Sequence, residues 1–298
     1  MRTALFHESA HLPESKLSPP LVCCVICGAE FTRNPVAKLQ DSPDVFLLRC
    51  PKCYACSGSR LPTESALIEY YSNYYRKPGP KVTHDCSGRF GRHVASFIGE
   101  PRRDVAITDF GGGEGRLAYS LAQILAERGC TSVEITVIDY AECVATQDPR
   151  ISIKAQRPGA TIPPSDVIVA SAVLEHLTDP LGSLTQLFGA LNRDGVLYVR
   201  TPAVAGILEF ATVLGRKLDF TFPAHIHDFG QRFWENVLNI VPEGSRFEVL
   251  HSAPSLVETD LRHHPWHTLA ACVAKAPWRL LGNKYTLVGG WEIVFRRK

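Results

Sequence analysis

From about residue 82 onward, the chain alternates short apolar runs with longer segments of helical spacing. The runs predict strands at residues 104–110, 132–138, 151–153, 167–171, 195–200, 247–252 and 291–297. The intervening spacing predicts helices over residues 88–98, 115–128 and 180–191. Because strands and helices alternate, we expect an α/β fold in which helices cover both faces of a doubly wound, mostly parallel sheet.

The first 80 residues follow a different pattern. They begin with a polar stretch that contains three prolines, and then hold six of the chain's ten cysteines. One helical pattern follows at residues 63–75, with Thr63 as its N-cap, and a proline–glycine segment ends this part. We therefore expect a flexible tail at residues 1–20, a cysteine-rich module with a tyrosine-rich helix at 21–80, and an α/β domain at 81–298.

A glycine-rich loop joins the strand at residues 104–110 to the helix that follows it. The loop reads Asp109-Phe110-Gly111-Gly112-Gly113-Glu114-Gly115. Gly111, Gly113 and Gly115 lack a Cβ, so the backbone can turn sharply and approach a ligand closely. The helix that follows adds unpaired N–H groups, which suit a carboxylate or a phosphate. The loop alone is compatible with a dinucleotide.

Residues beside the loop favour a different ligand. Dinucleotide-binding loops have a small residue where this chain has Arg116, and they lack an acidic residue such as Asp109 before the glycines. S-adenosylmethionine (SAM) carries an ammonium group that Asp109 could meet. Asp139 ends the next strand and could accept the two ribose hydroxyls of an adenosine. We therefore expect SAM as cofactor, with a helix-capping surface aspartate as the alternative role of Asp139.

A later segment resembles one family in particular. Leu174-Glu175-His176-Leu177-Thr178-Asp179-Pro180, together with the loop, is similar to the class I SAM-dependent methyltransferases. The resemblance covers residues 85–298. It implies a seven-stranded Rossmann-like sheet with its last strand antiparallel, and SAM at the carboxyl ends of the strands beside Ser171 and His176. Many members carry an acid that meets the adenine, where this chain offers Gln156.

Two pairs of cysteines have the spacing of a metal site. The pairs Cys24-x2-Cys27 and Cys50-x2-Cys53 are each able to form a turn whose sulfurs converge on one zinc ion. Four thiolates leave no open coordination position, so this zinc would be structural. Cys23 and Cys56 are spare thiols that leave the ligand set open, and unligated core cysteines are the alternative.

A zinc-binding module ahead of a SAM domain resembles bacterial sugar C-methyltransferases and related small-molecule methyltransferases. That resemblance implies a role in carbohydrate biosynthesis. The run Glu69-Tyr70-Tyr71-Ser72-Asn73-Tyr74-Tyr75 matches the tyrosine-rich helix of these enzymes. Tyrosine rings and hydroxyls suit a polyhydroxyl substrate, so Tyr71 and Tyr75 are candidate substrate contacts, with packing in the core as the alternative.

Two histidines are candidate catalytic residues. Methyl transfer from a sulfonium needs no metal, but it often needs a base that takes the acceptor's proton. His225 and His227 follow the fifth predicted strand, where the resembling sugar enzymes place a histidine-containing segment. A neutral imidazole is a suitable base near pH 7, and an extended segment would place both rings on one face. Structural hydrogen bonds with Asp228 are the alternative.

Composition and sequence motifs narrow the class of substrate and the cellular location. The formal net charge is only +2, and the basic residues form no dense stripe, which argues against nucleic acid as a partner. No apolar run is long enough to span a bilayer and no export signal is evident, so we expect a cytoplasmic protein with reduced cysteines. The segment after the fourth strand also lacks the motifs that methylate base amines or cytosine carbon.

These features together predict a methyltransferase that acts on a sugar, a sugar nucleotide or glycan, or another small polar metabolite, at oxygen or carbon. An RNA base methyltransferase whose zinc module grips RNA is the first alternative. A SAM-binding scaffold without activity is the second. The oligomeric state is not indicated by the sequence.

Overall fold

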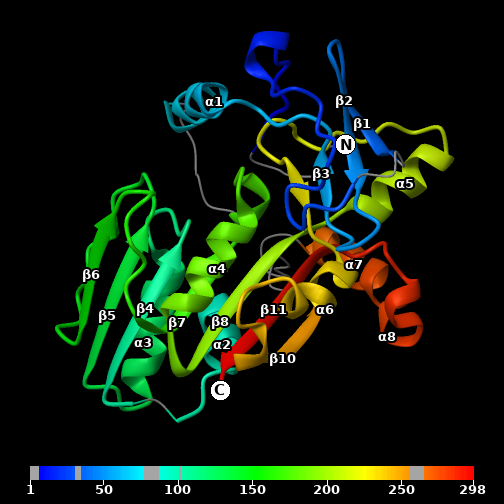
Figure 1. Cartoon of the computed structure of the whole chain (residues 1–298). Helices are drawn as coiled ribbons and strands as arrows, with labels where there is room; N and C mark the ends of the chain where they lie inside the picture. The colour runs from blue at the N-terminus through cyan, green and yellow to red at the C-terminus, as the bar shows by residue number, and fades with distance from the viewer. Residues whose placement is uncertain (1–6, 31–34, 77–86, 101, 256–264) are drawn as a thin grey trace.

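A computed structural model describes residues 7–30, 35–76, 87–100, 102–255 and 265–298 of the chain. Two sheets organise these residues, a large one formed by the second part of the chain and a small one that includes the cysteine-rich part (Figure 1). The expected boundary after residue 80 falls within 77–86, outside the described residues.

Seven strands form the large sheet. They are β4 (Asp104–Phe110), β5 (Ser132–Ile138), β6 (Ile151–Gln156), β7 (Ser165–Ser171), β8 (Leu191–Ala203), β10 (Phe247–Pro254) and β11 (Gly289–Arg297). Their order is β10-β11-β8-β7-β4-β5-β6. The five strands from β8 to β6 pair in parallel, whereas β11 is antiparallel to both of its neighbours. This arrangement confirms the predicted doubly wound sheet with an antiparallel last strand.

Helices pack on both faces of the large sheet. α2 (Ser87–Ala95) and α3 (Arg116–Glu127) share one hydrophobic cluster with the strands, and α4 (Pro180–Ala190) and α6 (Gln231–Asn236) share another. The side chains of β7 alternate between the two clusters, because successive side chains of a strand point to opposite faces. This double burial explains why the strands appear in the sequence as continuous apolar runs.

Four short antiparallel strands form the small sheet, which the sequence pattern did not predict. They are β1 (Pro35–Asp41), β2 (Asp44–Arg49), β3 (Cys56–Gly58) and β9 (His227–Asp228), in that order. β9 comes from the second part of the chain and pairs with β3, with Cys56 opposite Asp228 and Ser57 opposite His227. The α5 helix (Ala205–Val213) also contacts β1. The cysteine-rich part is thus joined to the α/β domain through a shared sheet.

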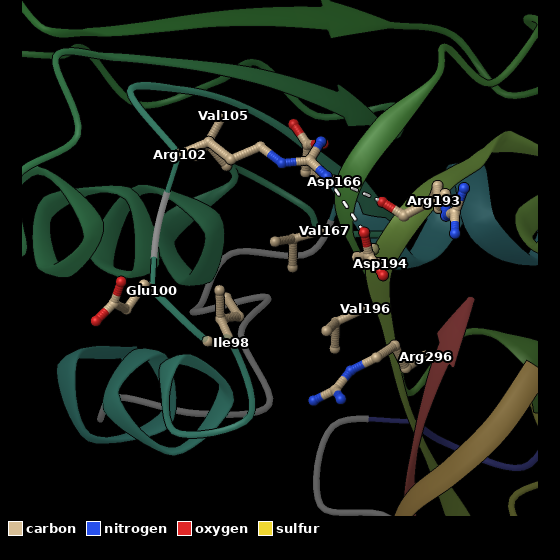
Figure 2. A pocket seen from close by; sticks show the side chains of 12 residues that line it. Ile98, Glu100, Arg102, Val105, Asp166, Val167, Arg193, Asp194, Val196 and Arg296 are labelled. Carbon is tan, nitrogen blue, oxygen red and sulfur yellow. Dashed lines mark hydrogen bonds and ion pairs between the residues drawn. The ribbon is translucent and has the colours of Figure 1, made fainter. Parts of the chain in front are cut away.

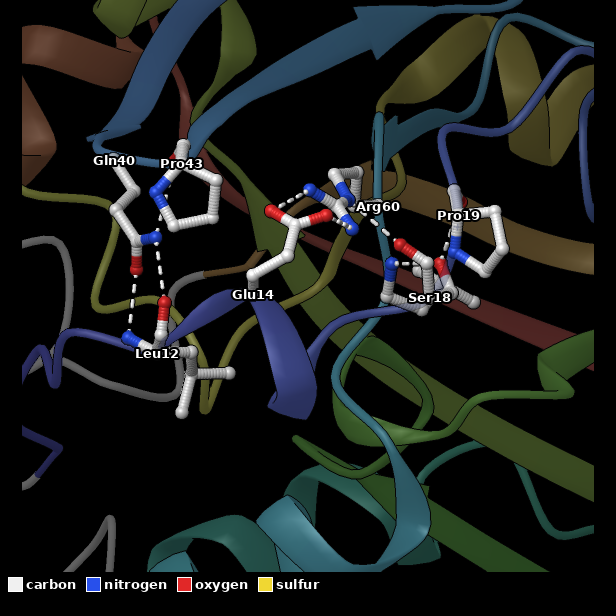
Figure 3. A network of polar contacts seen from close by, with 8 residues as sticks. Leu12, Glu14, Ser18, Pro19, Gln40, Pro43 and Arg60 are labelled. Atoms are coloured by element: carbon white, nitrogen blue, oxygen red, sulfur yellow. Dashed lines mark hydrogen bonds and ion pairs between the residues drawn. The ribbon is translucent and has the colours of Figure 1, made fainter.

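The described part of the N-terminal segment is packed against this small sheet. Leu12 and Leu17 are both buried. The side-chain amide of Gln40 donates to the Leu12 carbonyl at 2.9 Å, and Arg60 forms a two-bond ion pair with Glu14 at 2.6 and 2.7 Å (Figure 3). These contacts differ from the loose tail that polarity and prolines led us to expect, because two apolar side chains and one glutamate anchor the segment.

The tyrosine-rich helix is α1 (Glu64–Arg76), and it begins as predicted. The Ala66 N–H donates to Oγ1 of Thr63 at 3.3 Å, which is the geometry of an N-cap. α7 (Pro265–Lys275) and α8 (Trp278–Leu281) precede β11. Within the described residues, no helix combines the length and apolar character needed to cross a membrane.

Candidate functional site

The glycine loop between β4 and α3 holds three residues in the left-handed backbone region. The φ angle is 72° at Gly111, 58° at Gly113 and 76° at Gly115. A Cβ at Gly111 would lie 2.5 Å from Val173, and one at Gly115 would lie 2.7 Å from Val137, whereas the space at Gly113 is open. Glycine is therefore required at Gly111 and Gly115 for both conformation and space, and at Gly113 for conformation.

The Asp109 carboxyl is buried directly against this loop. A Cβ at Gly112 would lie 2.2 Å from its Cγ, so the loop backbone packs on the carboxyl group. Its Oδ2 has no hydrogen-bond partner among the described residues. Burial raises the pKa of Asp109 to about 7, an effect that the Ala118 N–H opposes and nearby Asp139 strengthens. A buried acid with a free lone pair is suited to a ligand that brings a positive charge.

Asp139 and Gln156 end two neighbouring strands of the same sheet edge. Asp139 accepts from the Gly113 N–H at 2.8 Å and from the Tyr140 N–H at 2.6 Å, so it ties the glycine loop to the end of β5. The Oε1 atom of Gln156 is buried without a hydrogen-bond partner in the described part of the chain. The two predicted adenosine contacts therefore lie side by side.

Ser171 ends β7 and is engaged by a residue that sequence reasoning missed. Its Oγ accepts from Nε of Arg200 at 2.9 Å. Arg200 lies on β8 and is buried, with its guanidinium 5.7 Å from the ring of Phe90. The sequence feature that could have pointed to Arg200 is its position as the single charged residue at the end of the apolar run 195–200.

His176 lies in the turn after β7 and meets His225 there. The Nδ1–H of His176 donates to the Ala224 carbonyl at 2.8 Å, and its ring centroid lies 5.0 Å from that of His225. Burial lowers the pKa of His176 to about 4 and moves that of His225 well below its usual value. Both rings are therefore neutral near pH 7, so each carries one protonated and one unprotonated nitrogen.

Thr221 sets the orientation of His225. Its hydroxyl donates to the Phe220 carbonyl at 2.5 Å, so it receives the Nδ1–H of His225 at 3.0 Å. The Nε2 atom of His225 is then the acceptor. Thr221 was also missed from the sequence, because a threonine four residues before a histidine carries no distinctive pattern.

His227 has different surroundings. It lies in β9, its Nδ1 is 2.8 Å from Oγ of Ser57, and its ring packs against Phe229 with centroids 5.7 Å apart. The side chain is fully buried, and burial lowers its pKa to about 4. The structure thus places His225 in a cluster with His176, and places His227 at the junction with the small sheet.

Aromatic rings from the N-terminal part border the two clustered histidines. His7 stacks on Tyr74 at 4.8 Å, and its ring lies 4.9 Å from that of His176. Tyr71 meets His176 edge-on at 6.3 Å. The side chain of Tyr75 lies outside the described residues. His7 was not predicted, because the N-terminal segment was expected to be loose.

The buried carboxyl of Glu175 completes this cluster. Its Oε1 lies 3.8 Å from Nε2 of His176. One ligand atom from each of Glu175, His176 and His225 lies within 4.8 Å of the other two. The cluster therefore combines two imidazoles and a carboxylate at the carboxyl end of β7.

The four predicted cysteine ligands converge on one point. The Sγ atoms of Cys24 and Cys53 are 3.7 Å apart, and those of Cys27 and Cys50 are 3.5 Å apart. Four sulfurs at the usual zinc–sulfur distance in a tetrahedron would be about 3.8 Å apart. The cluster contains neither Cys23 nor Cys56, the latter lying in β3. The donor set and spacing fit a tetrahedral zinc ion.

The two cysteine turns share one backbone design. Gly28 donates its N–H to the Cys24 carbonyl at 2.9 Å, and Tyr54 donates to that of Cys50 at 3.1 Å. Both donors have left-handed φ angles, 69° and 65°. In each turn the sulfurs are thus presented by the same local fold, as expected for a pair of metal-binding turns.

Two further features lie away from these groups. Glu292 accepts from His93 and His251 at 3.0 and 3.1 Å, and from the Tyr198 hydroxyl at 2.7 Å. A cavity of about 260 Å³ opens at the amino ends of β4, β7 and β8, where Arg102 pairs with Asp166 (Figure 2). It is lined by none of the predicted site residues and lies at the sheet edge opposite the glycine loop.

A family model described as a methyltransferase domain matches residues 83–239. The match includes the glycine loop, Asp139, the Leu174–His176 turn and both predicted catalytic histidines. No curated protein matches the chain.

Several solved structures are similar in part. A SAM-dependent methyltransferase from Mesorhizobium loti is 13% identical, with 72% of this chain and 100% of that chain covered and a TM-score of 0.46. Coclaurine N-methyltransferase bound to N-methylheliamine and SAH is 12% identical, with 76% and 78% covered and a TM-score of 0.43. The [4+2]-cyclase SpnF is 12% identical, with 74% and 84% covered and a TM-score of 0.40. At these scores the likenesses leave the acceptor open.

The glycine loop yields a stability prediction. Gly111→Ala and Gly113→Ala both place an alanine in the left-handed region, which costs about 1–2 kcal/mol. Only Gly111→Ala also meets Val173, so we expect it to lower the free energy of unfolding, measured with urea, by more than Gly113→Ala does. Adding Val173→Ala should recover part of that difference. Equal losses in the two single variants would contradict the steric argument.

Proposed function

This chain belongs to the methyltransferase-domain family and is a SAM-dependent methyltransferase, and on that premise we propose that its acceptor is a sugar, a sugar nucleotide or glycan, or another small polar metabolite. The observation that carries the proposal is the cluster of histidines and tyrosines at the carboxyl end of β7. These side chains offer polar atoms that can hydrogen-bond to hydroxyl groups, and flat rings that can pack against the apolar faces of a polyhydroxyl molecule.

The residues at the sheet edge fit SAM. Asp109 has the buried, unpartnered oxygen that suits the cofactor's ammonium group. Asp139 would hold the ribose and Gln156 the adenine, and the glycine loop leaves room for the cofactor's methionine part. Ser171 and His176 would lie beside the cofactor. When bound, SAM supplies an electrophilic methyl group on a sulfonium.

His225 is the histidine that we propose meets the acceptor. It shares a cluster with His176 and Glu175, and His7 and Tyr71 border the same cluster. His227 is assigned instead to holding β9 against β3, because its Nδ1 lies 2.8 Å from Oγ of Ser57 in β3 and its ring packs on Phe229. Tyr71 remains a proposed substrate contact, and Tyr75 is kept as a second one.

RNA is less well supported as the acceptor. Two of the basic residues near the cysteine module are already neutralised, since Arg49 pairs with Glu209 at 2.7 Å and Arg60 pairs with Glu14. The guanidinium of Arg60 is also mostly buried, so it cannot reach a phosphate. Lys77 and Lys81 lie outside the described residues.

We further propose that Cys24, Cys27, Cys50 and Cys53 hold a structural zinc ion. The sulfur separations and the paired turns support this assignment. The cysteines belong to the same hydrophobic cluster as Phe229, so the ion would stabilise the junction between the two sheets.

The raised pKa of Asp109 predicts how SAM binding depends on pH. Below pH 7 the free protein holds Asp109 protonated, and pairing with an ammonium group requires the carboxylate, so binding must release a proton. We expect SAM affinity to fall by about tenfold per pH unit below 7, and to level off above pH 7 over the range in which the ammonium group of SAM stays protonated. Calorimetry in two buffers of different ionisation enthalpy measures the released proton.

Two variants make this test specific. Asp109→Asn should abolish the proton release. Asp139→Ala should weaken SAM binding strongly at every pH and keep a proton release, shifted to lower pH because the Asp139 charge helps to raise the pKa of Asp109. Unchanged affinity in Asp139→Ala would remove the proposed ribose contact. The same proton release in Asp109→Asn would place the titrating group elsewhere.

The zinc assignment predicts metal content. The purified chain should carry about one zinc, and Cys24→Ser should lose it together with thermal stability, because a structural zinc contributes directly to folding. Cys23→Ser is the matched control and should keep the metal, since Cys23 is outside the cluster. Metal analysis of protein with intact thiols decides the assignment, and loss of zinc in both variants would refute this ligand set.

The acceptor prediction is tested by transfer of label from SAM. Sugars, sugar nucleotides and RNA are each offered as acceptors together with labelled SAM. We expect the label to appear in sugars or sugar nucleotides and not in RNA. His225→Ala should lower turnover by about 100-fold at nearly unchanged SAM affinity, because it removes a group that meets only the acceptor. His251→Ala, which lies outside the cluster, should keep full turnover. Transfer to RNA alone, or full activity in His225→Ala, would contradict the proposal.

A further inference from the structure

The two helices before β11 expose five large apolar side chains. Trp266 is 80% exposed, Val273 is 64% exposed and Leu280 is 91% exposed, and both Leu269 and Leu281 are just over half exposed. Single exposed apolar side chains are ordinary, but a group of them on adjoining helices marks a binding surface. Figure 1 shows α7 and α8 on the outside of the molecule. We call these five side chains the outer face of α7 and α8.

The two sides of α7 are the reverse of those in an ordinary surface helix. Its outer-face residues are three and four positions apart, so they share one side of the helix. The opposite side holds Thr268, which is buried, and Ala271 and Lys275, which are half-buried. A surface helix normally buries its large apolar side chains and exposes its polar ones. The fold of the chain therefore does not explain why α7 exposes the large ones.

Contacts on the inner side of α7 and α8 hold them in this orientation. The Lys275 side chain donates to the Ser255 carbonyl. The Trp278 ring lies 5.6 Å from that of Trp291 in β11, with centroids compared. Its Nε1–H donates to the Gln231 side chain of α6 at 2.9 Å. Because the inner side is attached to the α/β domain in this way, the outer face is turned toward solvent.

The sequence of this part of the chain is basic. Residues 265–291 contain three basic residues and no acidic residue, although the formal net charge of the whole chain is only +2. Arg279 and Lys284 are exposed. One acid from another element, Glu235 of α6, receives a hydrogen bond from Asn283 at 3.1 Å. The basic residues favour an anionic partner, and the outer face favours a partner with an apolar interior.

We propose that the outer face of α7 and α8 binds the surface of a lipid bilayer that contains anionic lipids. The side chains of Trp266 and Leu280 would enter the boundary between the head groups and the acyl chains, and Arg279 and Lys284 would meet the anionic head groups. The helices lie on the bilayer in this arrangement, since α7 has 11 residues and a span needs about 20.

A second copy of the chain is a less suitable occupant of the outer face. A two-fold symmetric contact places the same surface of both copies against itself. Arg279 and Lys284 would then lie close to the same residues of the second copy, and repulsion between like charges opposes such a contact. The bilayer supplies the opposite charge and the apolar interior together.

Flotation of the full-length protein with lipid vesicles tests the proposal. One set of vesicles contains phosphatidylglycerol and phosphatidylcholine in equal parts, and the other contains phosphatidylcholine alone. We expect at least about tenfold weaker binding to the second set, because each basic residue near an anionic surface contributes about fivefold. Raising the ionic strength from about 0.1 M to about 1 M shortens the Debye length from about 10 Å to about 3 Å, so it should remove this preference.

Substitutions on the outer face should weaken binding to the anionic vesicles. Trp266→Ser and Leu280→Ser should each weaken it by about tenfold or more, because each removes a large apolar side chain. Arg279→Gln should weaken it by about fivefold. Ile68→Ser, an exposed apolar residue of α1, and Arg193→Gln, an exposed arginine at the amino end of β8, are the matched controls and should bind as the wild type does. Thermal unfolding followed by circular dichroism reports that each variant is folded.

Tryptophan fluorescence distinguishes insertion into the bilayer from attraction by charge alone. Of the four tryptophans, Trp234 and Trp291 are buried, Trp278 is half-buried and Trp266 is exposed. Anionic vesicles should therefore shift the emission to shorter wavelength through Trp266. Trp266→Phe should still bind, because phenylalanine is apolar, but it should lose the shift.

Three results would each overturn the proposal. They are absence of binding to anionic vesicles, binding that is unchanged in both Trp266→Ser and Leu280→Ser, and binding without a shift in the wild-type emission. A wild-type dimer that Leu280→Ser converts to a monomer in analytical ultracentrifugation would assign the outer face to a second copy instead. Vesicle binding requires neither SAM nor an acceptor, so this inference and the proposed function fail separately.

Discussion

The pairing of β9 with β3 is the interaction on which the candidate site depends. Only two residue pairs form it, but the segment on either side of β9 is held from several directions. The Gly58 N–H donates to the Ile226 carbonyl at 2.9 Å, and the Ile226 N–H donates to the Glu175 carbonyl at 3.0 Å. This backbone ladder places the segment that contains His225 between the small sheet and the end of β7.

Burial determines the chemistry of the groups at the glycine loop and of those beside this ladder. It raises the pKa values of Asp109 and Asp228 to about 7 and lowers those of His176 and His227 to about 4. Asp228 accepts from the Val204 N–H at 2.5 Å, at the start of α5. Near neutral pH the buried histidines are therefore uncharged, and the buried acids are close to their titration points.

The large sheet and the glycine loop at its carboxyl edge were predictable because their signals are local. The strands at residues 104–110 and 132–138 agree with the structure at both ends, since buried parallel strands are continuous apolar runs. Asp109 and Asp139 were expected from the glycine loop and the end of the next strand, and Gln156 from the family resemblance. The structure places the three at the carboxyl edge of the sheet, and their contacts with SAM stay predictions. The four-cysteine cluster followed from spacing alone, and the structure added which of six candidate thiols belong to it.

The cluster of His7, His176 and His225 was harder to predict because its contacts are distant in sequence. β3 has three residues and β9 has two, too few for an alternating pattern. His7 is separated from His176 by most of the chain, and polar residues around it suggested a loose tail. The roles of His225 and His227 also depend on partners, Thr221 and Ser57, that no spacing between the histidines reveals.

The shared sheet has a consequence for how such a protein can be rearranged. A domain that is joined to its neighbour by a linker alone can be exchanged by recombination at that linker. In this protein, exchange of the N-terminal part alone would separate β9 from β3. The small sheet would lose an edge strand, and the α/β domain would expose the apolar side chains of Ile226 and Phe229. The two parts must therefore be inherited together, and a foreign module could replace this one only by recreating a strand partner for His227–Asp228.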